Sequence, residues 1–307
     1  MTNKRKLRPI LLTGSHRSGS TWVGKVLGTS RDLGYIREPF NIEVNPRTTT
    51  APIRYWFTKV DDTNENLFIK GLNDTLHFKY RPLAKIKEVY SIKDLGRFFI
   101  HWVKFTRYRT LQKTPLLKDP IALFSTPWLH SKFGLQTIVL IRHPAAFVSS
   151  ILKAGWHFDF THFTAQNNLM IELEEYNSKI VDFAEHHKPL IDQAILLWLV
   201  FHTYILKLKN KNFSNMTFIR HEDISRNPTL EFKRLFDWLN LEYIEKDILP
   251  YITEKNKSLI YNDPNNNLYR NPEENLFSWK DRLKDDEIEY IFNKVKQVSI
   301  NFYALDE

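Results

Sequence analysis

The sequence of 307 residues contains no cysteine, which excludes disulfide bonds, cysteine nucleophiles and thiolate metal sites. It also lacks a long hydrophobic run. The longest, AILLWLVFHTYIL at residues 194–206, is too short to span a bilayer and predicts a buried helix. The apolar residues that follow the basic start MTNKRKLR are too few for a signal peptide. We therefore expect a cytoplasmic protein with at most peripheral membrane contact.

Acidic residues are fewer than basic ones: 35 Asp and Glu against 44 Lys and Arg give a formal net charge of +9. A positive charge suits an anionic ligand, an acidic polymer or a membrane surface, and does not choose among them. Hydrophobic residues (42%) and charged residues (26%) lie in the ordinary range of a soluble globular protein. The length allows one large α/β domain or two small ones.

A phosphate-binding motif near the N-terminus lacks one residue. The stretch PILLTGSHRSGSTWVGKVLG, residues 9–28, has the form of a loop between a strand and a helix. In the nucleoside-triphosphate loop G-x-x-x-x-G-K-[ST], Gly14, Gly19 and Thr21 fit, whereas Ser20 stands in the place of the lysine. Backbone N–H groups and the helix dipole can still hold an anion there. Arg17 supplies a cation from within the loop.

Short apolar runs predict five β-strands, at residues 9–13, 33–36, 115–117, 137–141 and 216–219. Helical periodicity is best in residues 19–28, 91–107, 164–187, 190–209, 229–239 and 285–298. Charged or loop-forming residues follow every strand directly. Because ligands bind beyond the carboxyl ends of parallel strands, five such ends predict one polar site. We expect an α/β fold with a central parallel β-sheet flanked by helices.

The strand ends do not suit a magnesium site. A kinase or ATPase needs an aspartate after an apolar strand to hold the metal. Here the strand at 137–141 is followed by Arg142, and Asp119 is preceded by Lys118. His157 and His162 match no metal motif. We therefore expect an anionic nucleotide bound without a metal.

The loop resembles that of the sulfotransferases that use 3′-phosphoadenosine 5′-phosphosulfate (PAPS). Carbohydrate and tyrosylprotein members have an arginine where cytosolic members have a lysine, and Arg17 matches the former. A second family motif is a strand that ends in arginine, with a serine eight positions later, both holding the 3′-phosphate of the donor. IVLIRHPAAFVSS supplies Arg142 and Ser150. The resemblance implies one P-loop sulfotransferase domain over residues 1–307, with roughly 42–112 as an acceptor-binding or lid insertion.

The resemblance also implies the donor contacts. Trp22 falls where cytosolic members stack a tryptophan on adenine. His221, in TFIRHEDISRNP, stands where a nucleotide-carrying tyrosine is usual, and Arg270 belongs to a segment similar to the one that closes over the donor. The predicted donor-binding residues are Arg17, Ser18, Gly19, Ser20, Thr21, Trp22, Arg142, Ser150, His221 and Arg270. No metal is expected.

Three residues are predicted to act in catalysis. Arg17 and Lys118 would stabilise the charge that develops on the leaving oxygen. Pro120 occupies the place of the catalytic histidine of cytosolic members, so another base is needed. Glu38, in YIREPFN, resembles the glutamate of the carbohydrate and tyrosylprotein members and is our candidate for the general base. The alternative is that Glu38 only pairs with Arg37 or another basic group.

The predicted reaction is transfer of a sulfuryl group from PAPS to an acceptor hydroxyl. A carbohydrate or glycolipid is the preferred acceptor, a small phenol or lipid alcohol the alternative, and a P-loop kinase a third interpretation. The aromatic stretch 154–163 fits either a sugar-stacking wall or core packing. The basic aromatic helix at 91–109 fits acidic glycan, lipid headgroups or an ordinary amphipathic role. We expect no nucleic-acid partner, because basic residues look dispersed outside the N-terminal tail. The sequence does not indicate an oligomeric state.

Overall fold

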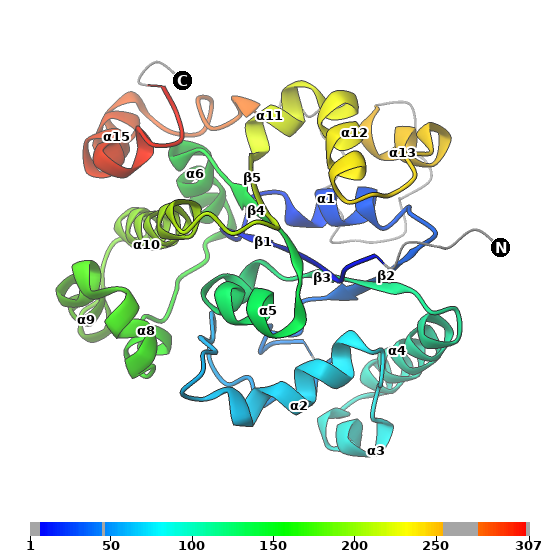
Figure 1. Cartoon of the computed structure of the whole chain (residues 1–307). Helices are drawn as coiled ribbons and strands as arrows, with labels where there is room; N and C mark the ends of the chain where they lie inside the picture. The colour runs from blue at the N-terminus through cyan, green and yellow to red at the C-terminus, as the bar shows by residue number, and fades with distance from the viewer. Residues whose placement is uncertain (1–6, 45–46, 254–275, 305–307) are drawn as a thin grey trace.

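A computed structural model describes residues 7–44, 47–253 and 276–304 of the chain. Its centre is a sheet of five parallel strands in the order β2-β3-β1-β4-β5 (Figure 1). The strands are β1 (Ile10–Gly14), β2 (Leu33–Arg37), β3 (Thr114–Lys118), β4 (Gln136–Ile141) and β5 (Met216–Arg220). All five predicted strands are therefore confirmed, and so is the α/β class.

Apolar side chains cover both faces of this sheet, as expected for parallel strands. In β1, Ile10 and Leu12 point to one face and Leu11 to the other, because side chains alternate along a strand. The first face packs against α1 (Ser20–Leu27), α12 (Pro228–Trp238) and α13 (Glu245–Ile252), with α11 (His221–Arg226) beside them. Figure 1 shows these helices as one layer above the sheet.

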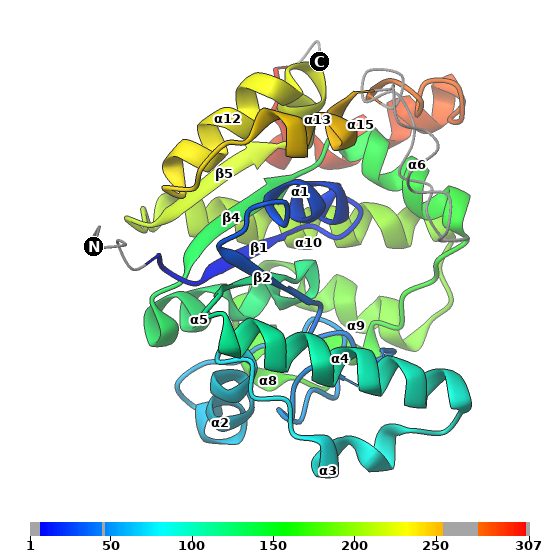
Figure 2. The same cartoon turned by 90° about the vertical axis from the view of Figure 1, so that its right-hand side faces the viewer.

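The second face carries the larger core. The helical elements on this side and at its margin are α2 (Glu65–Leu76), α3 (Pro82–Lys85), η1 (Ile86–Glu88), α4 (Ile92–Thr110), η2 (Pro120–Ser125), α5 (Thr126–Phe133), α6 (Pro144–Ala154), α10 (Leu190–Asn210) and α15 (Asp285–Ser299). In the turned view, α2, α3, α4 and α5 lie below the strands, and α12 and α13 lie above them (Figure 2).

The most apolar helix, α10, lies inside this second layer. Among the described residues, α10 is the one helix whose length and composition would allow it to span a membrane. However, 67% of its 18-residue apolar stretch is buried within the fold. It packs against α6 and α15. The apolar run at 194–206 therefore forms a core helix, as predicted from its length.

One predicted helix is wrong. Residues 164–187 do not form a continuous helix but α7 (Thr161–Thr164), α8 (Asn167–Glu172), η3 (Glu174–Tyr176) and α9 (Asn177–Glu185). Side chains at the breaks bond to distant loops. Gln166 Oε1 accepts the backbone N–H of Lys59 at 2.8 Å, and Asn168 Nδ2 donates to Asp61 Oδ2 at 2.9 Å. These contacts with a loop far away in sequence replace the regular helical path.

Candidate active site

Five strands end at one edge of the sheet, and a cleft of about 840 Å³ opens there. Its lining comes from the loop after β1 with the start of α1, from β2 and the residues after it, from residues 56 and 57, from the end of β3 with the start of η2, and from α6 and the residues after it. Predicted site residues in the lining are Arg17, Gly19, Ser20, Thr21, Trp22, Glu38, Lys118 and Ser150. Residues from five separated segments thus meet around one space, as the parallel topology predicted.

The phosphate loop after β1 depends on two glycines with positive φ. Gly14 has φ 132°, and a Cβ placed there would lie 2.2 Å from the carbonyl oxygen of Leu140 in β4. Gly19 has φ 80°, and a Cβ there would lie 2.4 Å from Nδ1 of His221. Neither position can take a side chain without a shift of its neighbours. The loop therefore presents its backbone to the cleft, and α1 begins directly after it at Ser20.

Arg17 connects the two anion-binding motifs. Its backbone is left-handed, with φ 64°, which is uncommon for a residue with a side chain. Its Nε donates a hydrogen bond of 2.9 Å to Oγ of Ser150 on α6. Burial lowers the pKa of Arg17, yet a guanidinium stays charged at any physiological pH. The loop and α6 are therefore within reach of one shared anionic ligand.

Arg142 follows β4 and is held from several sides. Its backbone N–H donates to Nε2 of His202 at 3.3 Å, and its carbonyl accepts from Nε1 of Trp198 at 2.8 Å. Its Nε lies 3.6 Å from Glu222 Oε1, and its side chain is 12% exposed. Burial lowers the pKa of Arg142, Glu222 opposes this, and the positive charges of Arg17 and Arg282 add to the lowering. The charges of Arg17 and Arg282 are thus close enough to act on Arg142.

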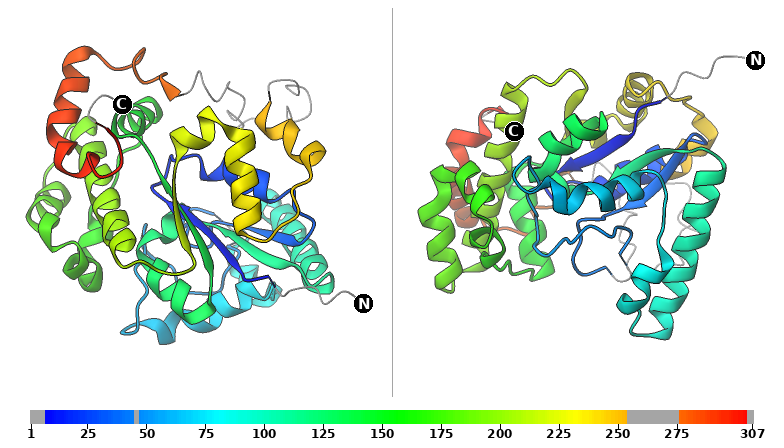
Figure 3. Two further views of the ribbon diagram at one scale, coloured as in Figure 1. Left: turned by 45° about the horizontal axis from the view of Figure 1, so that its top comes forward. Right: turned by 60° about the horizontal axis from the view of Figure 1, so that its bottom comes forward.

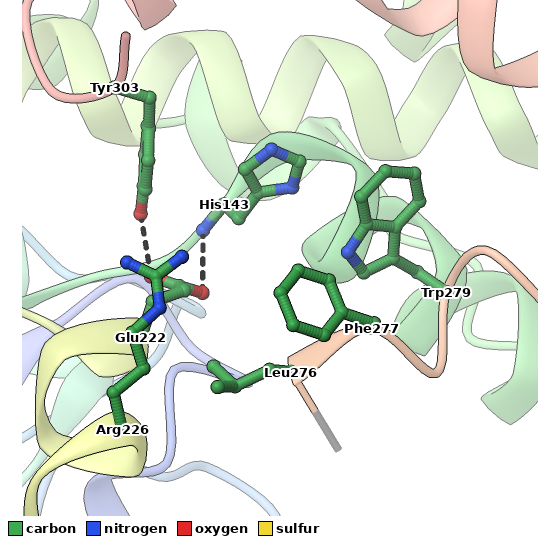
Figure 4. A pocket seen from close by; sticks show the side chains of 7 residues that line it. All are labelled: His143, Glu222, Arg226, Leu276, Phe277, Trp279 and Tyr303. Carbon is green, nitrogen blue, oxygen red and sulfur yellow. Dashed lines mark hydrogen bonds between the residues drawn. The ribbon is translucent and has the colours of Figure 1, made fainter. Parts of the chain in front are cut away.

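A small pocket of about 10 Å³, the size of one water molecule, is lined by Glu222, the partner of Arg142 (Figure 4). In it, Glu222 accepts the backbone N–H of His143 at 3.1 Å and the hydroxyl of Tyr303 at 2.8 Å. The His143 ring stacks on Trp279 with centroids 5.1 Å apart. The partner of Arg142, which lies on α11, is therefore fixed by a residue before α6 and a residue beyond α15.

Trp22 and His221 form an aromatic corner beside the loop. Nε1 of Trp22 donates to the carbonyl of Tyr251 at 2.8 Å, and the two rings are 6.0 Å apart. Burial, with the charge of Arg142, lowers the pKa of His221 well below its usual value, so the ring is neutral. Ser18, Arg142 and His221 lie behind the loop rather than in the cleft lining. The predicted contact Arg270 lies outside the described residues.

Glu38 and Lys118 form an ion pair at the ends of β2 and β3. Nζ of Lys118 contacts Oε1 of Glu38, and Asn41 Nδ2 donates to Oε2 at 2.9 Å. Glu38 has φ 44°, and its backbone N–H donates to the Lys118 carbonyl at 2.9 Å. Burial raises the pKa of Glu38, but Lys118 outweighs it and the pKa is lowered. The alternative pairing of Glu38 is thus present, with Lys118 rather than Arg37 as the partner.

Asp119 is completely buried behind this pair. Its carboxylate accepts the backbone N–H groups of Phe40 at 2.7 Å and Ile121 at 3.0 Å. Burial and the nearby charge of Glu38 raise the pKa of Asp119 to about 7. Both carboxylate oxygens are used by the backbone, so Asp119 shapes the turn that carries Glu38. It is not positioned as a metal ligand.

The rest of the cleft is aromatic and was largely missed by sequence reasoning. Trp56, Phe57 and Trp156 line it, with Pro120 and Ile121. His16 lies among these rings, 4.5 Å from the Trp156 centroid, with neither ring nitrogen hydrogen-bonded. Burial lowers the pKa of His16 to about 3, so the imidazole is neutral. The aromatic stretch predicted at 154–163 was the available signal for Trp156. No motif marked residues 56 and 57.

Comparisons with known proteins concern the family and the fold of the chain. The model of the sulfotransferase family matches residues 9–245, well over half of the chain. A sulfotransferase domain from the curacin biosynthetic pathway is similar in structure, with 16% identity, 95% of this chain and 99% of that one covered, and a TM-score of 0.51. A sulfotransferase domain from the Synechococcus PCC 7002 olefin synthase has 16% identity, coverage of 99% and 98%, and a TM-score of 0.50.

These two similarities show the fold alone, because the identity is low. A search of the curated proteins gives no match. Among the described residues, no group of three or more His, Asp or Glu side chains is arranged to hold a metal ion. The phosphate loop, the strand-end arginine and the family match together lead to one conclusion: the chain belongs to the sulfotransferase family.

Proposed function

We propose that the protein transfers a sulfuryl group from PAPS to an acceptor hydroxyl without a metal. The observation that carries the proposal is the convergence of the lysine-less phosphate loop, Arg142 and the Glu38–Lys118 pair at one edge of the sheet. Backbone N–H groups and Arg17 would hold the 5′-phosphosulfate. Arg142 and Ser150 would hold the 3′-phosphate.

The adenine would lie at the aromatic corner of Trp22 and His221. Trp22 lines the cleft, and the neutral ring of His221 packs on the backbone of Gly19. The Arg17–Ser150 hydrogen bond supports the binding of one nucleotide across the phosphate loop and α6, because it joins these two motifs. Arg282, which sequence reasoning missed, is close enough to act on Arg142 and adds positive charge on the same side.

In the proposed reaction, the acceptor oxygen forms a bond to sulfur while the bond from sulfur to the 5′-phosphate oxygen breaks. Negative charge then grows on that leaving oxygen. Lys118 and Arg17 would stabilise it, each by ~3 kcal/mol in a dry site. The acceptor proton would pass to Glu38, and adenosine 3′,5′-bisphosphate would leave with the sulfate ester as the second product.

The ion pair between Glu38 and Lys118 gives this step a specific order. While the pair is intact, the lowered pKa makes Glu38 a weaker base. A sulfuryl group beside Lys118 would offer the ammonium a second anionic partner and would weaken its hold on Glu38. The carboxylate would then be able to accept a proton when the donor is in place. Donor binding would therefore precede activation of the acceptor.

For the acceptor we propose a hydroxyl of a carbohydrate or glycolipid. The indoles of Trp56 and Trp156 offer flat apolar faces, and Asn41 and Arg37 offer hydrogen bonds on the same cleft. Stacked indoles with a few polar groups are typical of sugar recognition. Residues 42–112 contribute Trp56 and Phe57, in keeping with an acceptor-side insertion. A phenol or lipid alcohol, the alternative, would use the apolar wall without the polar groups.

A phosphate-loop kinase is not supported by the site. Ser20 replaces the lysine that reaches the β- and γ-phosphates. Asp119, the aspartate that follows β3, accepts backbone N–H groups with both carboxylate oxygens and is fully buried. Neither a phosphate-binding lysine nor a free aspartate is therefore present at this loop.

Calorimetric titration tests the donor. Adenosine 3′,5′-bisphosphate should bind without magnesium, and ATP with magnesium should not. Arg142→Gln should weaken bisphosphate binding at least tenfold, the cost of a lost charge-assisted hydrogen bond, and leave 5′-AMP binding almost unchanged. Arg234→Gln, at an exposed position on α12, is the matched control. Equal losses for both nucleotides would remove the 3′-phosphate contact from the proposal.

Turnover tests Glu38. The Glu38→Gln variant should bind the bisphosphate as the wild type does, yet transfer sulfate about 100-fold more slowly, because the proton acceptor is lost. The measurement is single-turnover transfer from labelled PAPS to a screened sugar acceptor, at a temperature where circular dichroism shows the variant to be folded. Near-normal transfer would eliminate Glu38 as the base.

A further inference from the structure

The segment 79–113, which contains α3, η1 and α4, carries most of the net charge of the protein. Ten of its residues are Lys or Arg and two are Asp or Glu, so its net charge is +8 against +9 for the whole chain. The expectation of dispersed basic residues was therefore wrong. The basic residues are Lys79, Arg81, Lys85, Lys87, Lys93, Arg97, Lys104, Arg107, Arg109 and Lys113.

The helix α4 in this segment has two apolar stripes, each at helical spacing. One, made of Phe98, His101, Phe105 and Tyr108, faces the body, where Phe105 is 1% exposed. The other faces solvent: Ile92, Leu95, Phe99, Trp102 and Val103 are between 43% and 90% exposed. A single stripe is enough to attach a helix to its own protein. The second stripe has no partner among the described residues.

The preceding turn extends the same kind of surface. Leu83, Ile86 and Tyr90 are 85%, 62% and 79% exposed. Figure 3 shows α3 and α4 standing away from the body of the molecule, on the side of the edge strand β2. At the far end of α4, Trp102, Val103 and Leu111 line an open apolar depression of about 480 Å³. Exposed apolar patches of this extent mark interaction sites in soluble proteins.

We propose that this surface, residues 82–111, docks on an anionic lipid bilayer. Lys93 and Arg97 flank the exposed stripe and match the negative surface of such a membrane, while the apolar side chains enter the headgroup layer. A second copy of the chain would bring the same positive surface against itself, with a net charge of +5 over residues 82–111, which opposes self-association. A nucleic acid would match the charge but leave the exposed leucines and isoleucines without an apolar environment.

The docking surface adjoins the cleft through the inner side of α4. Nζ of Lys104 lies 5.4 Å from the ring centroid of Tyr35, and Tyr35 lines the cleft. Docking would therefore bring the cleft close to the headgroups. This last step rests on the proposed function, since it makes the sugar of a glycolipid the acceptor that the docked enzyme meets. The docking itself stands without it.

Vesicle flotation tests the docking. The full chain should float with phosphatidylcholine vesicles that contain phosphatidylglycerol, not with phosphatidylcholine alone, and high salt should reduce flotation. Lys93→Gln combined with Arg97→Gln should weaken binding roughly 30-fold, at about 1 kcal/mol for each charge. Phe99→Ser combined with Trp102→Ser should also weaken vesicle binding, here because less apolar area enters the headgroup layer. Both pairs are exposed, so folding should be unaffected.

The matched controls lie on the opposite layer. Lys233→Gln with Lys246→Gln removes two exposed charges from α12 and α13, and Leu230→Ser removes a side chain that is 49% exposed. They should bind vesicles as the wild type does. Equal loss in controls and α4 variants would overturn the proposal, as would the absence of flotation at low salt. A dimer that Phe99→Ser with Trp102→Ser makes monomeric, without vesicle binding, would assign the surface to self-association.

Titration with adenosine 3′,5′-bisphosphate separates this proposal from the proposed function. If the chain floats with anionic vesicles but binds no bisphosphate, the docking surface stands and the donor assignment fails. If it binds bisphosphate and does not float, the donor assignment stands and the docking surface fails.

Discussion

The ion pair between Glu38 and Lys118 allows a quantitative prediction about stability. The Lys118 side chain is 2% exposed and that of Glu38 is 13% exposed, so both charges are largely removed from water. Glu38→Gln leaves the ammonium buried without a counter-charge, which costs ~3–5 kcal/mol of unfolding free energy. Lys118→Met should cost less, because Glu38 keeps its hydrogen bond from Asn41 and is nearer to solvent.

The double variant, Glu38→Gln with Lys118→Met, removes both charges and keeps the volume of both side chains. Replacement of a buried ion pair by neutral groups of similar shape is close to neutral, so we expect a loss under ~1 kcal/mol. The two single changes should therefore couple by at least ~2 kcal/mol. Urea denaturation followed by circular dichroism measures all four proteins. If the double variant lost as much unfolding free energy as the two single variants together, the reasoning from a buried ion pair would be refuted.

The same pair predicts a dependence on pH. The pKa of Glu38 is lower in the folded chain than in the unfolded one. The stability that ionised Glu38 contributes is therefore complete at pH values above the glutamate pKa in the unfolded chain. It is lost as the pH falls through the lower pKa in the folded chain. The wild type should lose its advantage over Glu38→Gln in acid, below the ordinary pKa of a glutamate. A difference between the two proteins that stays constant down to strongly acidic pH would contradict the assigned shift.

Three further predictions concern the loop and the cleft. Gly14→Ala should lower the unfolding free energy by about 3 kcal/mol, because the added Cβ would meet the carbonyl of Leu140 in β4. Gly134→Ala has nothing within 4 Å of the added Cβ and should cost only ~1 kcal/mol, from its positive φ. Equal losses of the two variants in urea denaturation would contradict the contact at Gly14. Ser150→Ala should weaken calorimetric bisphosphate binding by about tenfold, since a hydroxyl that bonds Arg17 is lost; unchanged affinity would place Ser150 away from the donor. Trp56→Ala should raise the KM for a sugar acceptor by ~10-fold and leave donor affinity intact, because its ring lies on the acceptor wall; a KM equal to that of the wild type would remove Trp56 from the acceptor site.

The phosphate-loop side of the cleft was predictable because its signals are local in sequence. The glycines of the phosphate loop, the five apolar runs and the polar residues after them lie in short, continuous stretches. A parallel sheet then brings their ends together whatever the order of its strands. The role of Arg270 stays a prediction, as do the roles assigned to Arg142 and Glu38 in the reaction.

The aromatic side of the cleft, at Trp56 and Phe57, was not predictable for the opposite reason. Trp56 and Phe57 reach the cleft through a loop whose course depends on Lys59 and Val60, which bond to Gln166 and Ser125. Such contacts join positions more than 60 residues apart and leave no periodic pattern. The same contacts explain the error at 164–187, where the apolar spacing favoured one helix. Tertiary hydrogen bonds, rather than intrinsic helix preference, decided the path of that segment.

Two indoles in the lining of the cleft also make the protein its own optical probe. Trp56 and Trp156 lie with centroids 6.1 Å apart and nearly perpendicular, next to the neutral ring of His16. A molecule that binds against both rings in the cleft changes the polarity around both chromophores at once. Fluorescence emission excited at the indole band can therefore rank unlabelled sugars, phenols and sterol-like alcohols for occupancy of the cleft. That ranking would be obtained before any of them has been shown to be sulfated.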